Sequence, residues 1–408
     1  MGYKTQAYRG ISWMGLLRLV TRVITFLRLA ILGRLLTPAQ FGVFGIASLL
    51  LSFLEILTET GINVFLVQEK EGYKAYINSA WAVSILRGII LALLIVLLAP
   101  FISSFFQAPE AYNIILLIAF VPFIRGFINP SIIIFQKELQ FHKEFMLRSA
   151  LFFTEAAVSM LFAYYTRSAV SFVYGLIASA IVEVILSFAF ISIWPALRFE
   201  YEKIKKIIRR GGWVTLTGIF AYFADNGDNI TVGKMLGSAS LGIYQVAYKF
   251  STLPISEITN VVNQVTFPVY TKFSDDKRRL WTAFLKINLL SAIAAIGMGA
   301  IIYVFAEPII LAFMGEQWVS AVPAVQVLAI FGVLRAIFGN FSALFLSKGR
   351  QDYVAQMTFF RVVALAVTVI PFVSMYGLVG AGYAMLLSII AEIPIVLYFS
   401  YKVFTQSK

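Results

Sequence analysis

The chain has 408 residues, of which 60% are hydrophobic and only 13% are charged. An average soluble domain is about 45–50% apolar and about 25% charged, so this composition, with a mean hydropathy of +0.86, indicates a membrane protein. It argues against a water-soluble enzyme, a disordered scaffold and, despite a net charge of +13, a nucleic-acid-binding protein. The lack of cysteine excludes disulfides, thiolate metal sites and cysteine nucleophiles.

Apolar runs recur along the whole chain. A hydrocarbon core about 30 Å thick needs roughly 20 apolar residues per helix, and by this measure the sequence predicts an all-α polytopic membrane protein with twelve transmembrane helices. The first run has no small-residue cleavage site after it, so we expect a retained span and not a signal peptide. The predicted spans are 11–33, 41–66, 79–101, 112–135, 147–165, 170–194, 212–233, 241–268, 282–305, 320–346, 354–375 and 378–401.

The distribution of Lys and Arg between the loops predicts the orientation. Cytoplasmic loops retain these residues, whereas translocated loops avoid them. The termini and even-numbered loops hold 21 of them, and the other side holds only Arg34, Arg167 and Lys234. We therefore expect a multi-pass protein of the cytoplasmic (inner) cell membrane with both termini in the cytoplasm. The basic, amphipathic run 200–210 is expected at the anionic inner surface.

The two halves of the sequence resemble each other. At an offset of 200 residues, 31–47 aligns with 231–247, and at an offset of 210 Arg125 matches Arg335. Chance similarity between apolar helices is the alternative, but Gly, Trp and Arg all register together. The pattern predicts two parallel six-helix repeats, 1–200 and 201–408, as two lobes around a central cavity, which is typical of transporters. Further matched pairs are Gly33 and Gly233, Leu36 and Leu236, Ala39 and Ala239, Gly42 and Gly242, Ala47 and Ala247, Trp13 and Trp213, Trp81 and Trp281, and Phe135 and Phe345.

The first half carries arginines inside its predicted spans. An ionisable group at the bilayer centre costs roughly 2.5–3.5 kcal/mol on insertion scales, so it usually faces a partner or a wet cavity. Arg stays charged and binds phosphate at two points, so an Arg-lined cavity suits a phosphate or diphosphate group. Snorkelling to the interface and pairing with acids are the alternatives. The predicted substrate-binding residues are Arg18, Arg22, Arg28, Arg87 and Arg125.

Glu55 and Glu59 are predicted to be structural counterions. The first two spans form an antiparallel hairpin, whose register places Arg22 at the depth of Glu55 and Arg18 at the depth of Glu59. We expect two ion pairs there. Arg28 has no acid at its depth in this hairpin, which makes it the most available ligand for a substrate.

The second half carries acids at the corresponding place. Asp225 and Asp228 are three residues apart on roughly one helix face, and Asp228 is the repeat equivalent of Arg28. Two aspartates in a partly desolvated site could carry a proton or, with neighbouring asparagines, bind a sodium ion. An ion pair with Arg28 or exposure to water is the alternative.

Other charged residues lie inside single spans. Glu155 and Glu183 are predicted, with the two aspartates, as ion-coupling residues, while a hydrogen bond inside the bundle is the alternative for them and for Glu392. Arg335 and Arg361 lie toward the cytoplasmic ends of their spans, and snorkelling explains them. We expect no metal site and no cofactor other than a coupling H⁺ or Na⁺.

Three stretches resemble the polysaccharide transporter branch of the MOP exporter superfamily, which includes the Wzx-type flippases of O-antigen and exopolysaccharide repeat units. They are LGRLLTPAQFGVFGIA (32–47), DNITVGKMLGSASLGIYQVAYKFSTLP (228–254) and NQVTFPVYTKF (263–273). The likeness covers nearly the whole chain. It implies a V-shaped pair of six-helix lobes around a cationic cavity. Many members have fourteen spans, so a lipid-tail groove built from two extra helices is not implied here.

The residues and the resemblance together predict a flippase that moves an undecaprenyl-diphosphate-linked oligosaccharide repeat unit across the membrane by ion-coupled alternating access. The expected partners are this lipid-linked oligosaccharide, membrane lipids, and the polymerase and chain-length regulator of the same pathway. A multidrug or other small-molecule exporter is one alternative, although drug cations favour an acidic cavity. A membrane glycosyltransferase or polymerase is another, but no catalytic motif occurs, so we expect no enzyme.

Overall fold

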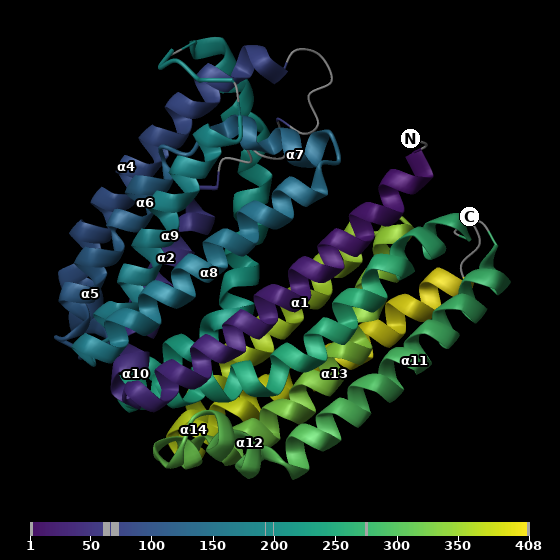
Figure 1. Cartoon of the computed structure of the whole chain (residues 1–408). Coiled ribbons are helices and arrows are strands. Elements are labelled where there is room, and N and C mark those ends of the chain that lie inside the picture. Colours follow the sequence, from purple (N-terminus) through teal and green to yellow (C-terminus); the bar gives the residue numbers. More distant parts are fainter. Residues whose placement is uncertain are drawn as a thin grey trace. The chain divides into compact units, whose positions relative to one another are not determined.

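The computed structural model describes residues 3–59, 66, 73–191, 193–198, 200–273 and 276–405. These ranges contain helices and no strand, which confirms the predicted all-α class (Figure 1). The helices are α1 (Tyr3–Leu35), α2 (Pro38–Leu57), α4 (Tyr73–Phe105), α5 (Ala111–Ile118), α6 (Phe120–Arg125), η1 (Pro130–Ile133), α7 (Ile134–Lys137), α8 (Phe141–Thr166), α9 (Val170–Ala189), α10 (Tyr201–Lys272), α11 (Lys277–Val304), α12 (Ala306–Phe313), η2 (Glu316–Ala321), α13 (Val322–Ser347) and α14 (Gln351–Thr405).

Seven helices of the described chain are long and apolar enough to cross a bilayer, and the bent pair Ala111–Arg125 and Pro130–Lys137 makes an eighth candidate. α1 and α10, which hold further predicted spans, do not pass this test, and both carry charged residues along their length. The chain is therefore a polytopic membrane protein. The count of twelve spans stays a prediction.

α10 and α14 each contain two of the predicted spans, joined at a glycine with non-helical backbone. Gly237 in α10 has φ 84° and ψ 175°, and Gly377 in α14 has φ 59° and ψ −134°. A positive φ is strained for residues with a Cβ, which is why glycine is found at such breaks. Gly237 lies 200 residues after Thr37, the N-cap that separates α1 from α2. The break inside α10 thus falls where the repeat places it.

Left-handed turn residues repeat along the chain in the same way. Leu139 and Gly349 both have positive φ and lie 210 residues apart, and the same is true of Arg167 and Gly377. In the first half these positions carry side chains, whereas in the second half they are glycines. The recurrence of a positive φ at one offset supports the internal repeat that the sequence predicts.

Helix packing divides the chain into two compact units, Met1–Ile219 and Phe220–Lys408. The second unit contains a large aromatic core. The predicted boundary between two six-helix lobes at residue 200 stays a prediction.

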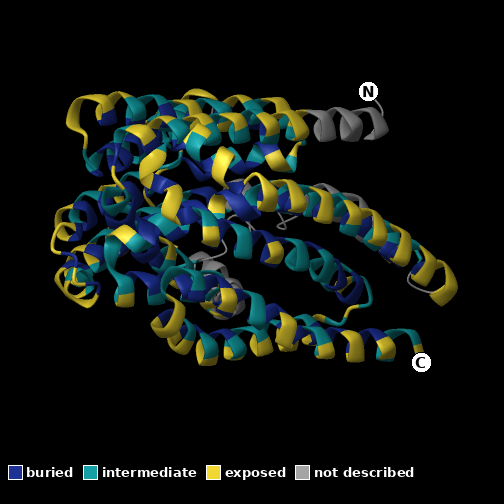
Figure 2. Cartoon of the chain, turned by 90° about the horizontal axis from the view of Figure 1, so that it is seen from below, coloured by how far each residue is buried: buried dark blue, intermediate teal, exposed yellow. Residues whose placement is uncertain are grey.

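Exposed residues recur along the helices in Figure 2, and many of them are large and apolar. On α4, Leu97 is 71% exposed, and on α11, Leu290 is 67% exposed. In water such faces would be unfavourable, but lipid chains solvate them, so they are typical of spans that face the bilayer.

Candidate functional site

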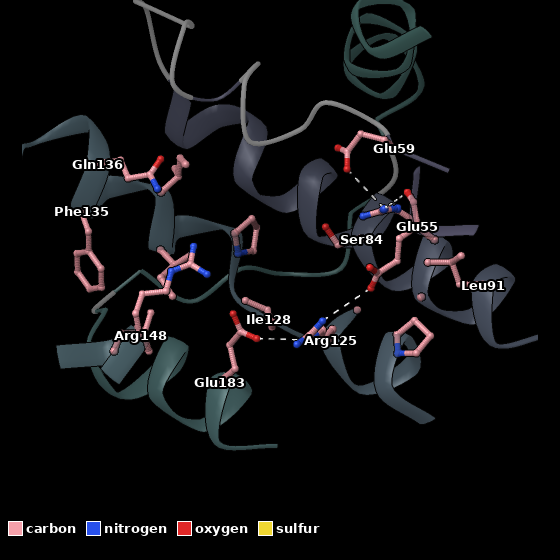
Figure 3. A pocket seen from close by; sticks show the side chains of 18 of the residues that line it. Glu55, Glu59, Ser84, Leu91, Arg125, Ile128, Phe135, Gln136, Arg148 and Glu183 are labelled. Atoms are coloured by element: carbon pink, nitrogen blue, oxygen red, sulfur yellow. Dashed lines mark hydrogen bonds and ion pairs between the residues drawn. The ribbon is translucent and has the colours of Figure 1, made fainter. Parts of the chain in front are cut away.

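The first unit contains a cavity of about 400 Å³, here called the N-terminal cavity (Figure 3). Residues of α2, α4, α6, α8 and α9 line it together with the bent segment around η1. Its acids outnumber its arginines by four to three, and of the five arginines predicted to bind substrate, Arg87 and Arg125 line it. The charged lining residues are Glu55, Glu59, Arg87, Arg125, Glu144, Arg148 and Glu183.

Two glycines bring α4 and α6 together beside this cavity. A Cβ built on Gly88 would lie 2.6 Å from the carbonyl oxygen of Pro122 and 3.0 Å from the Cα of Gly126. Only residues without a side chain allow this approach. Because each glycine directly follows an arginine, the contact places Arg87 and Arg125 on the wall of one cavity.

Arg125 lies between two carboxylates from different helices. Its Nη1 is 3.7 Å from Oε1 of Glu55 on α2, and its Nε is 3.6 Å from Oε2 of Glu183 on α9. Both distances exceed a strong hydrogen bond, and Arg125 Nε has no hydrogen-bond partner among the described residues. The side chain of Arg125 is 36% exposed. It is therefore shared loosely by two acids and has donors left for a ligand.

Arg87 is held more firmly to α2. Its Nη2 donates to the carbonyl oxygen of Glu55 at 2.8 Å, and its Nε donates to Oγ1 of Thr58 at 3.2 Å. The same Nη2 lies 3.6 Å from Oε2 of Glu59. These bonds cap the last turn of α2, where carbonyl groups lack helical partners. Arg87 therefore has a structural role as well as a place in the cavity.

The partners of Glu55 and Glu59 differ from those predicted. The hairpin register assigns Arg22 and Arg18 to them, whereas the structure places Arg125 and Arg87 at ion-pair distance. The prediction considered only the first two spans, and the bend of the fourth span brings Arg125 to α2.

Arg28 is not the unpaired ligand that the hairpin argument predicts. It donates through Nη1 to Glu155 on α8, and its guanidinium lies 5.5 Å from the ring centroid of Phe172. The side chains of Arg28 and Glu155 are 19% and 17% exposed. This pair joins the first and fifth spans, and it gives Glu155 a counterion that the sequence does not reveal.

The second unit contains a cavity of about 470 Å³, here called the C-terminal cavity. Its charged lining residues are Asp225, Arg335, Arg361 and Glu392, so its charges balance. Its neutral polar lining is larger than that of the N-terminal cavity. These residues are Asn226, Tyr248, Thr252, Ser256, Thr259, Ser342 and Thr358, compared with Ser84 and Gln136 in the first unit.

Asp225 connects the two arginines of the C-terminal cavity. Its Oδ1 accepts from Nη2 of Arg335 at 3.0 Å and lies 3.7 Å from Nη2 of Arg361. Arg335 also donates through Nη1 to the hydroxyl of Tyr248 at 2.8 Å. Snorkelling is therefore the wrong explanation for Arg335 and Arg361, because both guanidinium groups turn into the unit.

Asp228 lies elsewhere. It is fully buried, and its carboxylate accepts from the hydroxyl of Tyr244 at 2.7 Å and from the backbone and side chain of Asn229. Asp228 is not among the residues that line the C-terminal cavity. Asp228 is therefore not exposed to this cavity, and the two acids Asp225 and Asp228 have separate environments.

The sequence predicts no binding role for Arg335 or Arg361, and it predicts for Glu392 either a place in a proton path or a hydrogen bond inside the bundle. The match of Arg125 with Arg335 at an offset of 210 was the available signal, because Arg125 was already a predicted site residue. Glu183 and Glu392, on the last span of each repeat, line the corresponding cavities. The offset would have found Arg335, whereas Glu392 lies one residue before the match of Glu183 and Arg361 has no charged match.

Comparison with known proteins places the chain in a family. The family model described as "Polysaccharide biosynthesis protein" matches residues 31–323. The chain belongs to this family. It is 24% identical over 393 residues to the lipopolysaccharide biosynthesis protein WzxC of Escherichia coli K12, covering 95% of this chain and 79% of that protein. It is 26% identical to the teichuronic acid biosynthesis protein TuaB of Bacillus subtilis, covering 85% and 72%.

Solved structures show the same fold. The lipid II flippase MurJ in an inward closed conformation superposes with a TM-score of 0.76 at 16% identity, covering 97% of this chain and 88% of that one. An inward-facing multidrug resistance transporter of the MATE family has a TM-score of 0.73 at 18% identity, covering 94% of both chains. At these identities the likeness shows a fold of the MOP superfamily, as the sequence motifs predict.

Proposed function

We propose that this protein is a flippase that moves a polyprenyl-diphosphate-linked oligosaccharide across the cytoplasmic membrane for polysaccharide biosynthesis. The single observation that carries the proposal is Arg125, a half-exposed cation inside the membrane region whose donors are only loosely occupied. A diphosphate offers the planar, two-point acceptor that a guanidinium binds best. The family membership supplies the pathway.

Arg125 takes the place that the sequence argument gave to Arg28. Arg28 and Arg87 are held by Glu155 and by the end of α2, so their charge is already used within the unit. Arg18 and Arg22, on α1, stay candidate ligands for the same headgroup. The glycan passes through water-filled space, while the polyprenyl chain remains in lipid.

The proposed coupling of transport to an ion depends on competition for Arg125 between the substrate diphosphate and the carboxylates of Glu55 and Glu183. When a diphosphate binds Arg125, Glu55 and Glu183 lose part of their counterion in a partly desolvated cavity. Carboxylates in that situation take up protons, because the charged form is no longer stabilised. We therefore propose H⁺ as the coupling ion, with Glu55 and Glu183 as the proton-accepting pair in place of the two aspartates.

The placement of the substrate and the orientation complete the proposal. With both termini in the cytoplasm, the basic loops lie on the side of the membrane where lipid-linked sugars are assembled. The protein must bind its substrate on this side and release it on the other, which requires two conformational states with different affinities for the substrate. Partners are the lipid-linked oligosaccharide, and the polymerase and chain-length regulator that would receive it.

Transport by reconstituted protein tests the proposal. Proteoliposomes with a fluorescent undecaprenyl-diphosphate-linked oligosaccharide should lose protection from an impermeant quencher, faster with an imposed proton gradient than with a sodium gradient. The same lipid with a monophosphate should move much more slowly. Equal rates with protein-free liposomes would refute the proposal.

A small-molecule exporter is the second candidate, because acids outnumber arginines in the N-terminal cavity. An organic cation is attracted by such a lining. Export of ethidium from the same proteoliposomes, with no movement of the glycolipid, would favour this function.

A further inference from the structure

We propose that the C-terminal cavity is a binding site for an uncharged, hydroxyl-rich saccharide, the glycan part of the transported molecule. The inference rests on the proposed function and assigns a separate site to the part of the substrate that carries no phosphate. The cavity measures about 470 Å³, within the range of small-molecule sites.

The charges of this cavity suit a neutral ligand. Arg335 and Arg361 balance Asp225 and Glu392, and three of these four groups form one connected network. A diphosphate would have to displace Asp225 from both arginines. A cation would meet two guanidinium groups within the same space. A ligand without net charge meets neither cost.

Four hydroxyl groups of the cavity lining are available as acceptors. The hydroxyls of Thr252, Ser256, Thr259 and Thr358 donate to carbonyl groups of their own helices, so their remaining lone pairs are acceptors. Their orientation is fixed by these bonds. A ligand rich in hydroxyl donors is complementary to this lining.

Glu392 provides the strongest acceptor. The residue is only 9% exposed and lines the cavity, yet it makes no hydrogen bond or ion pair with any of the described residues. Arg361 and Arg335 act on it only through space. A buried carboxylate without donors is costly, and two adjacent sugar hydroxyls would supply donors to its two oxygens. The N-terminal cavity has only Ser84 and Gln136 as neutral polar lining residues.

Unique cysteines test the assignment, because the chain has none of its own. Ser342→Cys reports on the C-terminal cavity, Ser84→Cys on the N-terminal cavity, and Ser374→Cys on an exposed position of α14. Alkylation by a small thiol reagent is timed in membrane vesicles. The probes are lipid-linked oligosaccharide extracted from membranes of the source cells, the free glycan released from it by mild acid, and inorganic pyrophosphate.

The expected result is selective protection. Free glycan at ten times its Kd should slow alkylation of Ser342→Cys about tenfold by mass action, without affecting Ser84→Cys or Ser374→Cys. Pyrophosphate should protect Ser84→Cys alone. Glu392→Gln, which keeps the shape but loses the charge, should weaken protection of Ser342→Cys several-fold. If that variant fails to accumulate, Thr259→Val serves as a second test of the same wall.

Two results would overturn the assignment. Free glycan that leaves Ser342→Cys unprotected at its highest soluble concentration excludes a saccharide site, and protection by sodium chloride but not choline chloride assigns the cavity to a cation. The proposed function fails separately, when the intact lipid-linked extract protects neither Ser84→Cys nor Ser342→Cys. If the extract protects Ser84→Cys but not Ser342→Cys, the proposed flippase function is retained and the proposed saccharide site is wrong.

Discussion

The two units place charged residues on corresponding helices but use them differently. Arg125 in the fourth predicted span of the first repeat faces Glu183 in the sixth, and Arg335 in the tenth span shares a cavity with Glu392 in the twelfth. Arg125 is 3.6 Å or more from both of its acids, whereas Arg335 has two direct hydrogen bonds. The loosely held arginine is the one available to an anion.

A second correspondence reverses the sign of the charge. Arg28 pairs with Glu155 between the first and fifth spans, and Asp225 pairs with Arg361 between the seventh and eleventh. The same two spans of each repeat are thus joined by an ion pair of opposite polarity, although the residues differ by about one helical turn in the repeat alignment. Comparison of residue identities misses such a pair, whereas comparison of contacts finds it.

The largest expected effect is at Arg125. Arg125→Gln should lower the transport rate about 10- to 100-fold, because a charge-assisted hydrogen bond contributes about 1.5–3 kcal/mol. Arg125→Lys should fall between this variant and wild type, since it keeps the charge and loses the two-point geometry. The measurement is glycolipid movement in proteoliposomes at matched protein levels.

Arg148 supplies the control for this prediction. It lines the same cavity and is held no more tightly than Arg125, since its Nε lies 3.9 Å from Glu144. However, its side chain is 48% exposed and lies at the predicted cytoplasmic end of its span, where water and salt screen its charge. Arg148→Gln should therefore reduce transport far less than Arg125→Gln. Equal losses would mean that the cavity attracts the diphosphate through total charge, and the special role of Arg125 would be wrong.

The next largest effect concerns the ion pair of Arg28 and Glu155. Removing one partner of a buried pair destabilises by about 3–5 kcal/mol, because the other charge is left without compensation. Arg28→Gln and Glu155→Gln should each reduce the amount of monodisperse protein, measured by fluorescence-detected size-exclusion chromatography, and the double variant should recover part of it.

The exchanged variant sharpens the comparison between the units. Arg28→Glu combined with Glu155→Arg gives the first unit the sign order of Asp225 and Arg361. We expect recovery of a large part of the wild-type amount, since the reversed pair again compensates both charges. A double variant as damaging as the two single variants together would show that the residues do not interact.

The sequence predicted the fold class and the family, and only part of the site. Hydropathy and the matched Gly, Trp and Arg residues of the two halves depend only on the order of residues along the chain, so the sequence alone reveals them. The pairs Arg28 with Glu155 and Arg125 with Glu183 join spans far apart in the chain. Which helices are neighbours depends on packing and on the bent fourth span, and a register argument limited to one hairpin could not include them.

A smaller effect is expected where α4 and α6 touch. The Cβ of Gly88→Ala would lie 2.6 Å from the carbonyl oxygen of Pro122, so the helices must separate. Overpacking of this kind costs about 1–3 kcal/mol, and the shift should also lower transport, since Arg87 and Arg125 adjoin the contact. Gly15→Ala is the control, because its Cβ meets no atom within 4 Å. Equal melting temperatures for the two variants would contradict the close approach.

The smallest effect concerns the left-handed turns, where the two repeats differ by a side chain. Gln107 has φ 52° and Gly315 has φ 95°, each in the loop between the third and fourth spans of its repeat. A left-handed conformation costs a residue with a Cβ about 1–2 kcal/mol, and glycine loses about 0.5–1 kcal/mol more chain entropy on folding. Gln107→Gly should thus be stabilising by about 0.5–1 kcal/mol.

Melting curves of the purified protein can resolve this difference. For a unit of about 200 residues, 1 kcal/mol corresponds to about 2–4 °C, so Gln107→Gly should raise the Tm by about 2 °C. Gly315→Ala should lower the Tm, and steric clash cannot be the reason, because its Cβ would meet no atom within 4 Å. Gln107→Ala removes the exposed side chain without freeing the backbone and should leave the Tm unchanged. If Gln107→Ala raises the Tm as much as Gln107→Gly, the stabilisation comes from removal of the glutamine side chain and not from relief of backbone strain. The turns at Gln107 and Gly315 would then differ in backbone strain.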